Sequence, residues 1–457
     1  MVRPPLLAAL GLLAACHGGS PQTTPPDAGD PGPAFTVAER AQLDALSPQT
    51  LPAPPADSSN RFADNPRAAL LGQRLFFEPL FSGRLLDGDN DGSSTTLGMA
   101  GQTGRVACAG CHVPSAGFLD NRSLGKQVSL AAGWGLRRTP SLLDVAQARL
   151  LMWDGRQDAF YNQALGPLES SQEMNSSRLY VAEQIARLYR PAYEEIFGPL
   201  PPLAEAAHFP QLDASQTGCD RLQGGLGPPV CHGRPGDGAE YDGLAAADQE
   251  AVTRVVVNAG KALGAYLRRL SCGPGRFDRW AHGDSSALTA SEQRGAQLFV
   301  GKANCASCHS GPYLSDEKFH NVGLAPATVA VVFTDTGDRG AGLGFAQALA
   351  NPLNVRSRFS DGDDGRLPKA PGPDQEGAFR TPGLRCLGRR PSFMHTAQLS
   401  SIADVVAFFD GGGHPFGYPG KSELVQLGLS AGERRDLAAF LGTLNGPGPE
   451  ASLLVSP

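Results

Sequence analysis

The 457-residue sequence lacks three features that would decide its class at once. It has no basic excess, because 39 Lys and Arg residues stand against 45 Asp and Glu residues and the formal net charge is −6. A nucleic-acid-binding protein would show a basic footprint, so the charge argues against that class, whereas it is compatible with docking a basic redox partner. Beyond the N-terminus it has no apolar run of the ~20 residues that a membrane span needs. Stretches alternating with period two are few, which predicts a mainly α protein.

The N-terminus carries the pattern of an export signal. Arg3 gives a positive start, an apolar run covers residues 6–15, and Leu-Ala-Ala precedes Cys16. A charged start, a short apolar core and small residues are typical of a secretory signal. A cysteine in that place resembles the lipidation site of bacterial lipoproteins; the alternative is an ordinary signal with an incidental cysteine. We expect residues 1–16 to end at a lipidated Cys16, residues 17–59 to be a flexible tether and lead-in, and the body to be periplasmic and lipid-anchored.

Export would place the nine cysteines in an oxidising compartment. The expected lipidation accounts for one of them, and the two motifs described next account for four more. The four that remain allow two disulfides: Cys219, Cys231, Cys272 and Cys386. Cys219 and Cys231 lie in one Gly- and Pro-rich stretch and are the expected pair, but the sequence cannot decide how the other two are paired.

Two copies of the pattern C-x-x-C-H dominate the sequence: Cys108-Ala-Gly-Cys111-His112 and Cys305-Ala-Ser-Cys308-His309. This is the attachment pattern of c-type haem. The two thiols bond to the vinyl groups of one porphyrin, and the adjacent histidine becomes the proximal ligand of the iron. Zinc is disfavoured because no further ligands follow at a fixed spacing. The sequence therefore predicts two covalently bound haems, with His112 and His309 as iron ligands.

Apolar residues recur at helical spacing in several segments. The expected helices cover residues 67–80, 248–270, 291–299, 402–409 and 431–444. Long irregular connections lie between them. One connection, residues 87–94 (DGDNDGSS), resembles the start of a calcium loop, but Gly98 stands where such a loop needs an acidic residue. We therefore interpret it as a solvated surface loop.

Taken together, the motifs resemble those of the bacterial di-haem cytochrome c peroxidase family, including its MauG-like branch. Matching segments run in the family's order from Asn65 to Gly446. They include LGQRLFFEPLFSG, CAGCHVPSAGFLDNRS, WDGRQDAFYNQALGPLESSQEM, RGAQLFVGKANCASCHSGPYLSD and FMHTAQLSSIADVVAFFDGGG. The resemblance implies two cytochrome c-like α domains with one haem each. Residues 60–245 would form the N-terminal, peroxide-reacting domain, and residues 246–450 the C-terminal, electron-transferring domain.

The resemblance also implies roles for single residues. Gln163 and Glu173 match residues beside the peroxide-reacting haem, where a carboxylate can move a proton between the peroxide oxygens and an amide can orient the peroxide. Pro167 matches a residue packed over the same pocket. Trp153 matches a tryptophan between the haems and is the expected electron relay; a buried core aromatic is the alternative, and both can hold. His395 belongs to a signature near the second haem, where a hydrogen-bonding or a catalytic role stays open.

The sequence departs from the family pattern at two iron ligands. Many members have a histidine between the first haem motif and the RRTP segment that caps the resting iron, but residues 113–138 contain none. The first haem is therefore expected to be open without prior reduction, as in MauG. The Met or Tyr that ligates the second haem is replaced by Phe409, which cannot bind iron. That haem then either lacks a protein sixth ligand or takes another group such as His414.

A third departure concerns a calcium ion that the family commonly binds between its domains, through an asparagine and two backbone carbonyls. Arg138 occupies the position of the asparagine, and the carbonyl segment reads RRPSF, around Arg390 and Ser392. A cation beside an arginine is electrostatically unfavourable. The resemblance allows calcium here, but the arginine disfavours it.

The favoured function is reduction of hydrogen peroxide to water with electrons from a small cytochrome c or cupredoxin, with Glu173, Gln163 and Trp153 as catalytic residues. One alternative is a MauG-like oxidase that modifies a side chain of a partner protein. An alternative of another class is a non-catalytic di-haem electron carrier, which would have no use for Glu173 and Gln163 beside an open iron. No nucleic acid is expected as a partner, the membrane is contacted only through Cys16, and a homodimer is allowed.

Overall fold

Helices joined by long irregular segments make up most of the computed structural model, which describes residues 32–122, 128–224, 227–325 and 337–457. The α-helices in these ranges are α1 Val37–Leu46, α2 Pro66–Phe76, α3 Cys108–Cys111, α4 Phe160–Glu169, α5 Arg178–Leu188, α6 Arg190–Phe197, α7 Ala239–Asp242, α8 Ala246–Leu267, α9 Arg276–Ala281, α10 Ala290–Val300, α11 Ala341–Ala350, α12 Ile402–Asp410 and α13 Ala431–Gly442. Short 3₁₀ turns are η1 Pro114–Ala116, η2 Val145–Gln147, η3 Ser285–Ala287, η4 Cys305–Ser307, η5 Pro373–Gln375, η6 Leu387–Arg389 and η7 Ala451–Leu453.

Strand structure in the described ranges is limited to two antiparallel pairs. Strand β1 (Gly218–Cys219) pairs with β2 (Cys231–His232), and β3 (Phe319–His320) pairs with β4 (Phe379–Arg380). The mainly α fold predicted from the sequence is thus confirmed. The expected signal at residues 1–16 and the first part of the tether lie outside the described residues. Within the described part of the chain, no helix is long and apolar enough to cross a membrane.

Local signals in the sequence explain where the helices begin and end. The side chain of Asn65 accepts hydrogen bonds from the backbone N–H groups of Arg67 and Ala68, and Pro66 occupies the first turn of α2. Helix α2 ends at Phe76, short of the expected residue 80, because Pro79 cannot donate a helical hydrogen bond. Helices α10 and α13 both begin with a capping box, in which Thr or Ser is followed three residues later by Glu.

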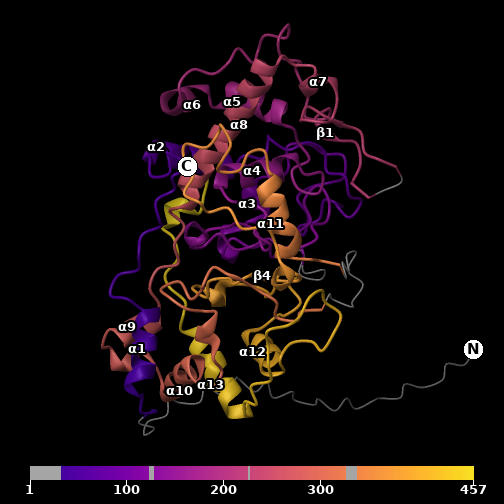
Figure 1. Cartoon of the computed structure of the whole chain (residues 1–457). Helices are drawn as coiled ribbons and strands as arrows, with labels where there is room; N and C mark the ends of the chain where they lie inside the picture. Colours follow the sequence, from indigo (N-terminus) through magenta and orange to yellow (C-terminus); the bar gives the residue numbers. More distant parts are fainter. Residues whose placement is uncertain (1–31, 123–127, 225–226, 326–336) are drawn as a thin grey trace, which may run out of the picture.

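The first hydrophobic core forms where α2, α4 and α5 pack around α8. Two glycines allow this close packing. A side chain at Gly72 of α2 would collide with the backbone carbonyl of Ala262 on α8, and one at Gly260 of α8 would collide with the backbone of Tyr161 on α4. These helices form the upper group in Figure 1. Cys111 of the first C-x-x-C-H motif packs against this core.

The second core contains residues of α1, α9, α10, α12 and α13 and makes up the lower group in Figure 1. A buried ion pair crosses it: both Nη atoms of Arg385 donate to the carboxylate of Asp278, at 2.8 and 2.9 Å. Burial alone would raise the pKa of Asp278, but the hydrogen bonds and charge of Arg385 keep it below its ordinary value. This core carries the second C-x-x-C-H motif.

The two cores do not follow the linear order of the chain. Helix α8 begins at residue 246, after the expected domain boundary, yet it is central to the first core. Helix α1 lies in the expected lead-in but packs on α10 in the second core. Leu353, Val355 and Phe359 return from the second half to the first core. The division at residues 245 and 246 stays a prediction, and we propose that α8 belongs with the first haem domain.

Both pairs of cysteines outside the motifs form disulfides. Cys219 bonds to Cys231 across the β1–β2 pair, which confirms the expected pairing. Cys272 bonds to Cys386, two residues that are 114 positions apart. This second bridge ties the segment after α8 to the segment before α12.

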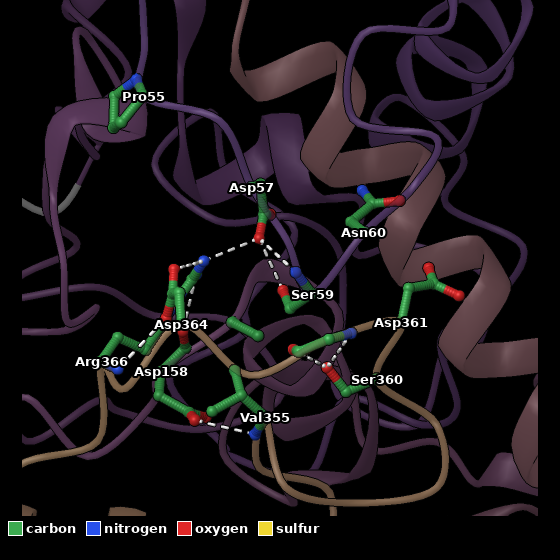
Figure 2. A network of polar contacts seen from close by, with 12 residues as sticks. Pro55, Asp57, Ser59, Asn60, Asp158, Val355, Ser360, Asp361, Asp364 and Arg366 are labelled. Carbon is green, nitrogen blue, oxygen red and sulfur yellow. Dashed lines mark hydrogen bonds and ion pairs between the residues drawn. The ribbon is translucent and has the colours of Figure 1, made fainter.

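A polar network joins the lead-in segment to both halves of the chain (Figure 2). The guanidinium of Arg366 donates to the carboxylate of Asp57 at 2.9 Å and to the backbone carbonyl of Asp158 at 3.1 Å. The carboxylate of Asp158 accepts a hydrogen bond from the backbone N–H of Val355 at 2.9 Å. These hydrogen bonds hold the part of the lead-in around residue 57 against the folded body.

Candidate haem sites

The first C-x-x-C-H motif forms a one-turn helix, α3, with the histidine at its end. The backbone N–H of His112 donates to the carbonyl of Cys108 at 2.8 Å, and Nδ1 of His112 donates to the carbonyl of Phe118 at 3.1 Å. Since a carbonyl only accepts, Nδ1 carries the proton and the Nε2 lone pair is free to bind a metal. Burial lowers the pKa of His112 to about 4, which keeps the ring neutral.

The second motif repeats this arrangement. Residues Cys305–Ser307 form the turn η4, the backbone N–H of His309 donates to the carbonyl of Cys305 at 2.9 Å, and Nδ1 donates to the carbonyl of Leu314 at 2.9 Å. Burial lowers the pKa of His309 to about 4 as well. Both histidines therefore present a neutral ring with Nε2 free, the form that ligates iron.

All four motif cysteines, Cys108, Cys111, Cys305 and Cys308, are free thiols. Burial raises the pKa of Cys108, Cys111 and Cys305 to about 12, so these sulfurs are uncharged. Cys108, Cys111 and His112 line a cavity of about 490 Å³. Two thiols spaced for thioether bonds, a free imidazole nitrogen and an apolar hollow fit a covalently attached haem.

Glu173 lines the same cavity as His112. Burial raises the pKa of its carboxyl group, while the charge of Arg156 and a hydrogen bond with the Ser170 side chain act in the opposite direction. The loop is held in place because the backbone carbonyl of Glu173 accepts from the N–H of Ala132 at 2.9 Å. A cavity carboxyl group with a raised pKa is a candidate for holding and transferring a proton.

Gln163 projects into the cavity from α4, four residues before Pro167, which also lines it. Its Nε2 donates to the sulfur of Met152 at 3.6 Å. Sequence reasoning missed Met152, which adopts a left-handed backbone conformation with φ 70° directly before Trp153. It also missed Arg156, although that residue lies in the quoted WDGRQ segment. The hydrogen bond between Gln163 and Met152 and the effect of the Arg156 charge on Glu173 become visible only in three dimensions.

Trp153 connects the cavity with the strand β4. Its indole N–H donates to the backbone carbonyl of Arg138 at 2.7 Å, and its own carbonyl accepts from the N–H of Arg380 at 2.8 Å. The ring centroids of Trp153 and His395 are 6.4 Å apart. His395 in turn stacks on Phe379, with ring centroids 3.6 Å apart. Trp153 therefore lies at one end of a short row of aromatic rings that begins in the cavity.

His395 is buried, and burial lowers its pKa to about 3. A neutral, stacked imidazole suits a structural role. Its backbone carbonyl accepts from the N–H of Arg138 at 2.8 Å, which fixes the segment that carries Arg138.

Phe409 lies on α12 in edge-to-face contact with Phe408. His414, the alternative ligand for the second haem, lies against Phe408 and accepts a hydrogen bond from the backbone N–H of Ala325 through Nδ1, at 2.9 Å. An accepting Nδ1 places the proton of the neutral ring on Nε2. Neither ring nitrogen of His414 is then free to ligate iron in this arrangement.

Arg138 and Ser392, which match the family's calcium position, lie together, but a hydrogen bond joins them directly. Nη1 of Arg138 donates to the backbone carbonyl of Ser392. In the 87–94 loop these acidic side chains accept hydrogen bonds: Asp87 from the backbone N–H of Asp89, and Asp89 from the indole N–H of Trp134, which lies outside the loop. Among the described residues no three His, Cys, Asp or Glu side chains group so as to hold a metal ion.

Solved structures of known proteins share this fold. The diheme peroxidase BthA from Burkholderia thailandensis matches with a TM-score of 0.58 at 21% sequence identity, over 88% of this chain and 96% of that chain. A MauG-like protein associated with microbial copper homeostasis matches with a TM-score of 0.56 at 22% identity, over 90% of this chain and 96% of that chain. The fold is thus that of mainly helical two-haem proteins.

Sequence comparison gives the family. The sequence pattern described as di-haem cytochrome c peroxidase matches residues 66–216. The methylamine utilization protein MauG of Methylorubrum extorquens is 30% identical over 427 residues, covering 90% of this chain and 88% of that protein. The cytochrome-c peroxidase IdrP1 of Denitromonas iodatirespirans is 28% identical over 420 residues, covering 90% of each. The chain belongs to the di-haem cytochrome c peroxidase and MauG family, and it is an oxidoreductase with two c-type haems.

Proposed function

We propose that the protein reduces hydrogen peroxide to water in the cavity around His112, with electrons delivered by a small redox protein through the second haem. Each turnover consumes one peroxide, two protons and two electrons and yields two waters. The observation that carries this proposal is Glu173, a cavity carboxyl group whose pKa is raised by burial and which lies in the same hollow as the free Nε2 of His112.

The haem attachments follow from the motif geometry. Cys108 and Cys111 would hold the first haem with His112 as its iron ligand, and Cys305 and Cys308 would hold the second with His309. The free thiols and the two Nδ1–H···carbonyl hydrogen bonds support this assignment. When bound, the first haem supplies a metal that can accept a peroxide oxygen and exchange electrons.

Proton handling is the task of this chain's own side chains. Glu173 would take a proton from the peroxide oxygen nearer the iron and return it to the farther one, so that the farther oxygen leaves as water. The charge of Arg156 limits how far burial raises the pKa of Glu173. Gln163, oriented by Met152, would hold the peroxide by hydrogen bonding.

Replacement of Glu173 tests this proposal. Glu173→Gln keeps the size of the side chain and removes its proton transfer, so kcat/KM for peroxide with a reduced small cytochrome should fall about 100- to 10,000-fold. Glu205→Gln, at an exposed position outside the cavity, is the matched control and should retain wild-type turnover. Unchanged turnover by a haem-loaded Glu173→Gln variant would overturn the assignment.

A second function is favoured by one specific feature, the lack of a capping histidine in residues 113–138. An open first haem and 30% identity to MauG also suit peroxide-dependent oxidation of a partner protein. The two functions are separated by supplying peroxide with either a reduced cytochrome or candidate periplasmic proteins. Donor oxidation supports the peroxidase, whereas covalent change in a partner protein, detected by mass spectrometry, supports the alternative.

We also propose a periplasmic location with a lipid anchor at Cys16. The support is the N-terminal pattern, which precedes the described residues, together with two disulfides that need an oxidising compartment. Cys16→Ala should leave the protein in the soluble periplasmic fraction, whereas the wild type should incorporate labelled fatty acid and sediment with membranes. Sedimentation of Cys16→Ala with membranes would contradict the anchor.

A further inference from the structure

Arg138 is a buried cation without an adequate partner. The residue is only 3% exposed, and its Nη1 donates to the backbone carbonyl of Ser392. Its Nε and Nη2 atoms have no hydrogen-bond partner in the described residues. Burial of the guanidinium, together with the nearby charge of Arg390, lowers the pKa of Arg138 to about 9. A buried unpaired charge is strongly unfavourable, so the site is incomplete as the protein chain alone makes it.

Arg390 adds a second unsatisfied guanidinium at the same place. Its Nη2 donates to the backbone carbonyls of Gly383 and Arg385 at 2.5 and 3.4 Å, and its Nε has no hydrogen-bond partner in the described residues. Burial lowers the pKa of Arg390 to about 10. In the described residues, the hydrogen bonds that Arg390 and Arg138 donate therefore go to uncharged backbone carbonyls.

The acidic side chains nearby are already engaged. The carboxylate of Asp120 binds Arg122 at 2.6 Å. The carboxylate of Asp144 accepts from the hydroxyl of Ser271 at 2.9 Å and from the backbone N–H of Cys272 at 3.2 Å. The chain thus offers no free carboxylate to the two arginines among its described residues, and the fitting ligand is an anion from outside the chain. Guanidinium N–H groups match the planar geometry of carboxylates.

Each of the two arginines lies near one of the two motif histidines. Arg138 lines the cavity that contains Cys108, Cys111 and His112. Arg390 is close enough to His309 for its charge to lower the pKa of that histidine. A carboxylate bound by Arg138 and Arg390 would therefore belong to a group held at a haem site. Each c-type haem carries two propionate carboxylates.

We propose that Arg138 and Arg390 form a fixed cationic site that binds haem propionate carboxylates and takes the place of a metal ion between the two haems. The contact between Arg138 and Ser392 supports the replacement of a metal ion. A cation bound to that backbone carbonyl would need the position that Nη1 of Arg138 occupies. This proposal rests on the haem attachments proposed above. Because the positive charge belongs to the protein chain, removal of calcium should not change the haem potentials.

The test uses the haem-loaded protein and three variants: Arg138→Asn, Arg138→Lys and the control Arg149→Asn. Arg149 is exposed, and its guanidinium donates to the backbone carbonyl of Gly365. Haem content is measured first. Absence of covalent haem would contradict the proposed function itself, whereas a haem-loaded protein allows this inference to be tested separately. The midpoint potentials of both haems are then followed by spectroelectrochemistry, with a calcium chelator and again with added calcium.

We expect the wild-type and Arg149→Asn potentials to be insensitive to chelator and to calcium. Arg138→Asn should lower the potential of at least one haem, because a positive charge near the propionates stabilises the reduced form. Added calcium should restore that potential in Arg138→Asn, and Arg138→Lys should lie between the two. Wild-type potentials that change with chelator would overturn the proposal, as would unchanged potentials in Arg138→Asn. Potentials that change with acetate concentration would assign the site to a solution carboxylate instead of the propionates.

Discussion

The indole N–H of Trp153 donates to the backbone carbonyl of Arg138 at 2.7 Å. This hydrogen bond joins the ring that we propose as an electron relay to the arginine that we propose as a fixed cation. Both residues line the cavity around His112, and both connect to the segment of His395, through a ring contact in one case and a backbone hydrogen bond in the other. Electron passage and the charge between the haems are therefore expected to respond to changes in either residue.

Trp153→Phe tests the relay. The variant keeps an aromatic ring but leaves the Arg138 carbonyl without its donor, which should cost about 1–3 kcal/mol of folding free energy. Electron transfer from the second haem to the first, followed by stopped-flow absorbance, should be slower than in the wild type. Trp134→Phe is the control, because it removes the donor to Asp89 outside the cavity. Equal electron-transfer rates in the two variants would refute a relay at Trp153.

Met152→Leu tests how Gln163 is oriented. The substitution preserves apolar volume and removes the sulfur that accepts from Gln163. Loss of about 1 kcal/mol of orientation energy corresponds to about a fivefold decrease in kcat/KM for peroxide. Met99→Leu, at an exposed methionine, should leave kcat/KM as in the wild type. A Met152→Leu enzyme with full activity would mean that Gln163 is held by other contacts.

Glu183 should make stability depend on pH. It is 8% exposed, and its carboxylate accepts a hydrogen bond from the backbone N–H of Leu212 at 3.3 Å. Burial raises its pKa to about 8. The folded state therefore binds the proton more tightly than the unfolded state, whose carboxyl group has the ordinary value of 4.5. The stabilisation is complete below that value and is lost as pH rises through about 8.

Denaturant titrations between pH 5 and about pH 9 measure this effect. The free energy of unfolding should decrease with pH in the wild type and in Glu205→Gln, and the decrease should be smaller in Glu183→Gln. Parallel pH profiles for Glu183→Gln and the wild type would show that Glu183 is ionised at little cost.

The two disulfides should contribute unequally to stability. Because Cys272 and Cys386 are 114 positions apart and Cys219 and Cys231 only 12, the first bridge restricts the unfolded chain more. Loop entropy gives about 5 kcal/mol for the long loop and about 3 kcal/mol for the short one. Double Cys→Ala variants at each bridge, compared by chemical denaturation, should follow that order. A larger loss at the short bridge would indicate that local packing decides the difference.

Much of the helical fold could be predicted from the sequence, because apolar spacing and capping residues are local signals. Helices α8, α10, α12 and α13 begin and end within a few residues of the expected positions. Helix α2 was expected to reach residue 80 and ends at Phe76, before Pro79. The Cys219–Cys231 pair was also predictable, since both residues lie in one short stretch.

Other features depend on contacts between distant residues, for which one sequence carries no signal. The pairing of Cys272 with Cys386 and the packing of α8 on the first core belong to this group. So does the contact between Arg138 and Ser392, whose positions differ by 254. The family resemblance assigned these two residues to one site. It did not predict the hydrogen bond from the Arg138 guanidinium to the Ser392 carbonyl.

The central claim is that the first haem is open to peroxide and that Glu173 makes it reactive. Electron paramagnetic resonance of the oxidised, haem-loaded protein, before and after addition of peroxide together with a reduced small cytochrome, tests it most directly. The account predicts a high-spin ferric signal that peroxide removes while the cytochrome is oxidised, with a much slower change in Glu173→Gln. Two low-spin ferric signals that peroxide leaves unchanged would contradict it and would indicate a carrier of electrons without catalytic function.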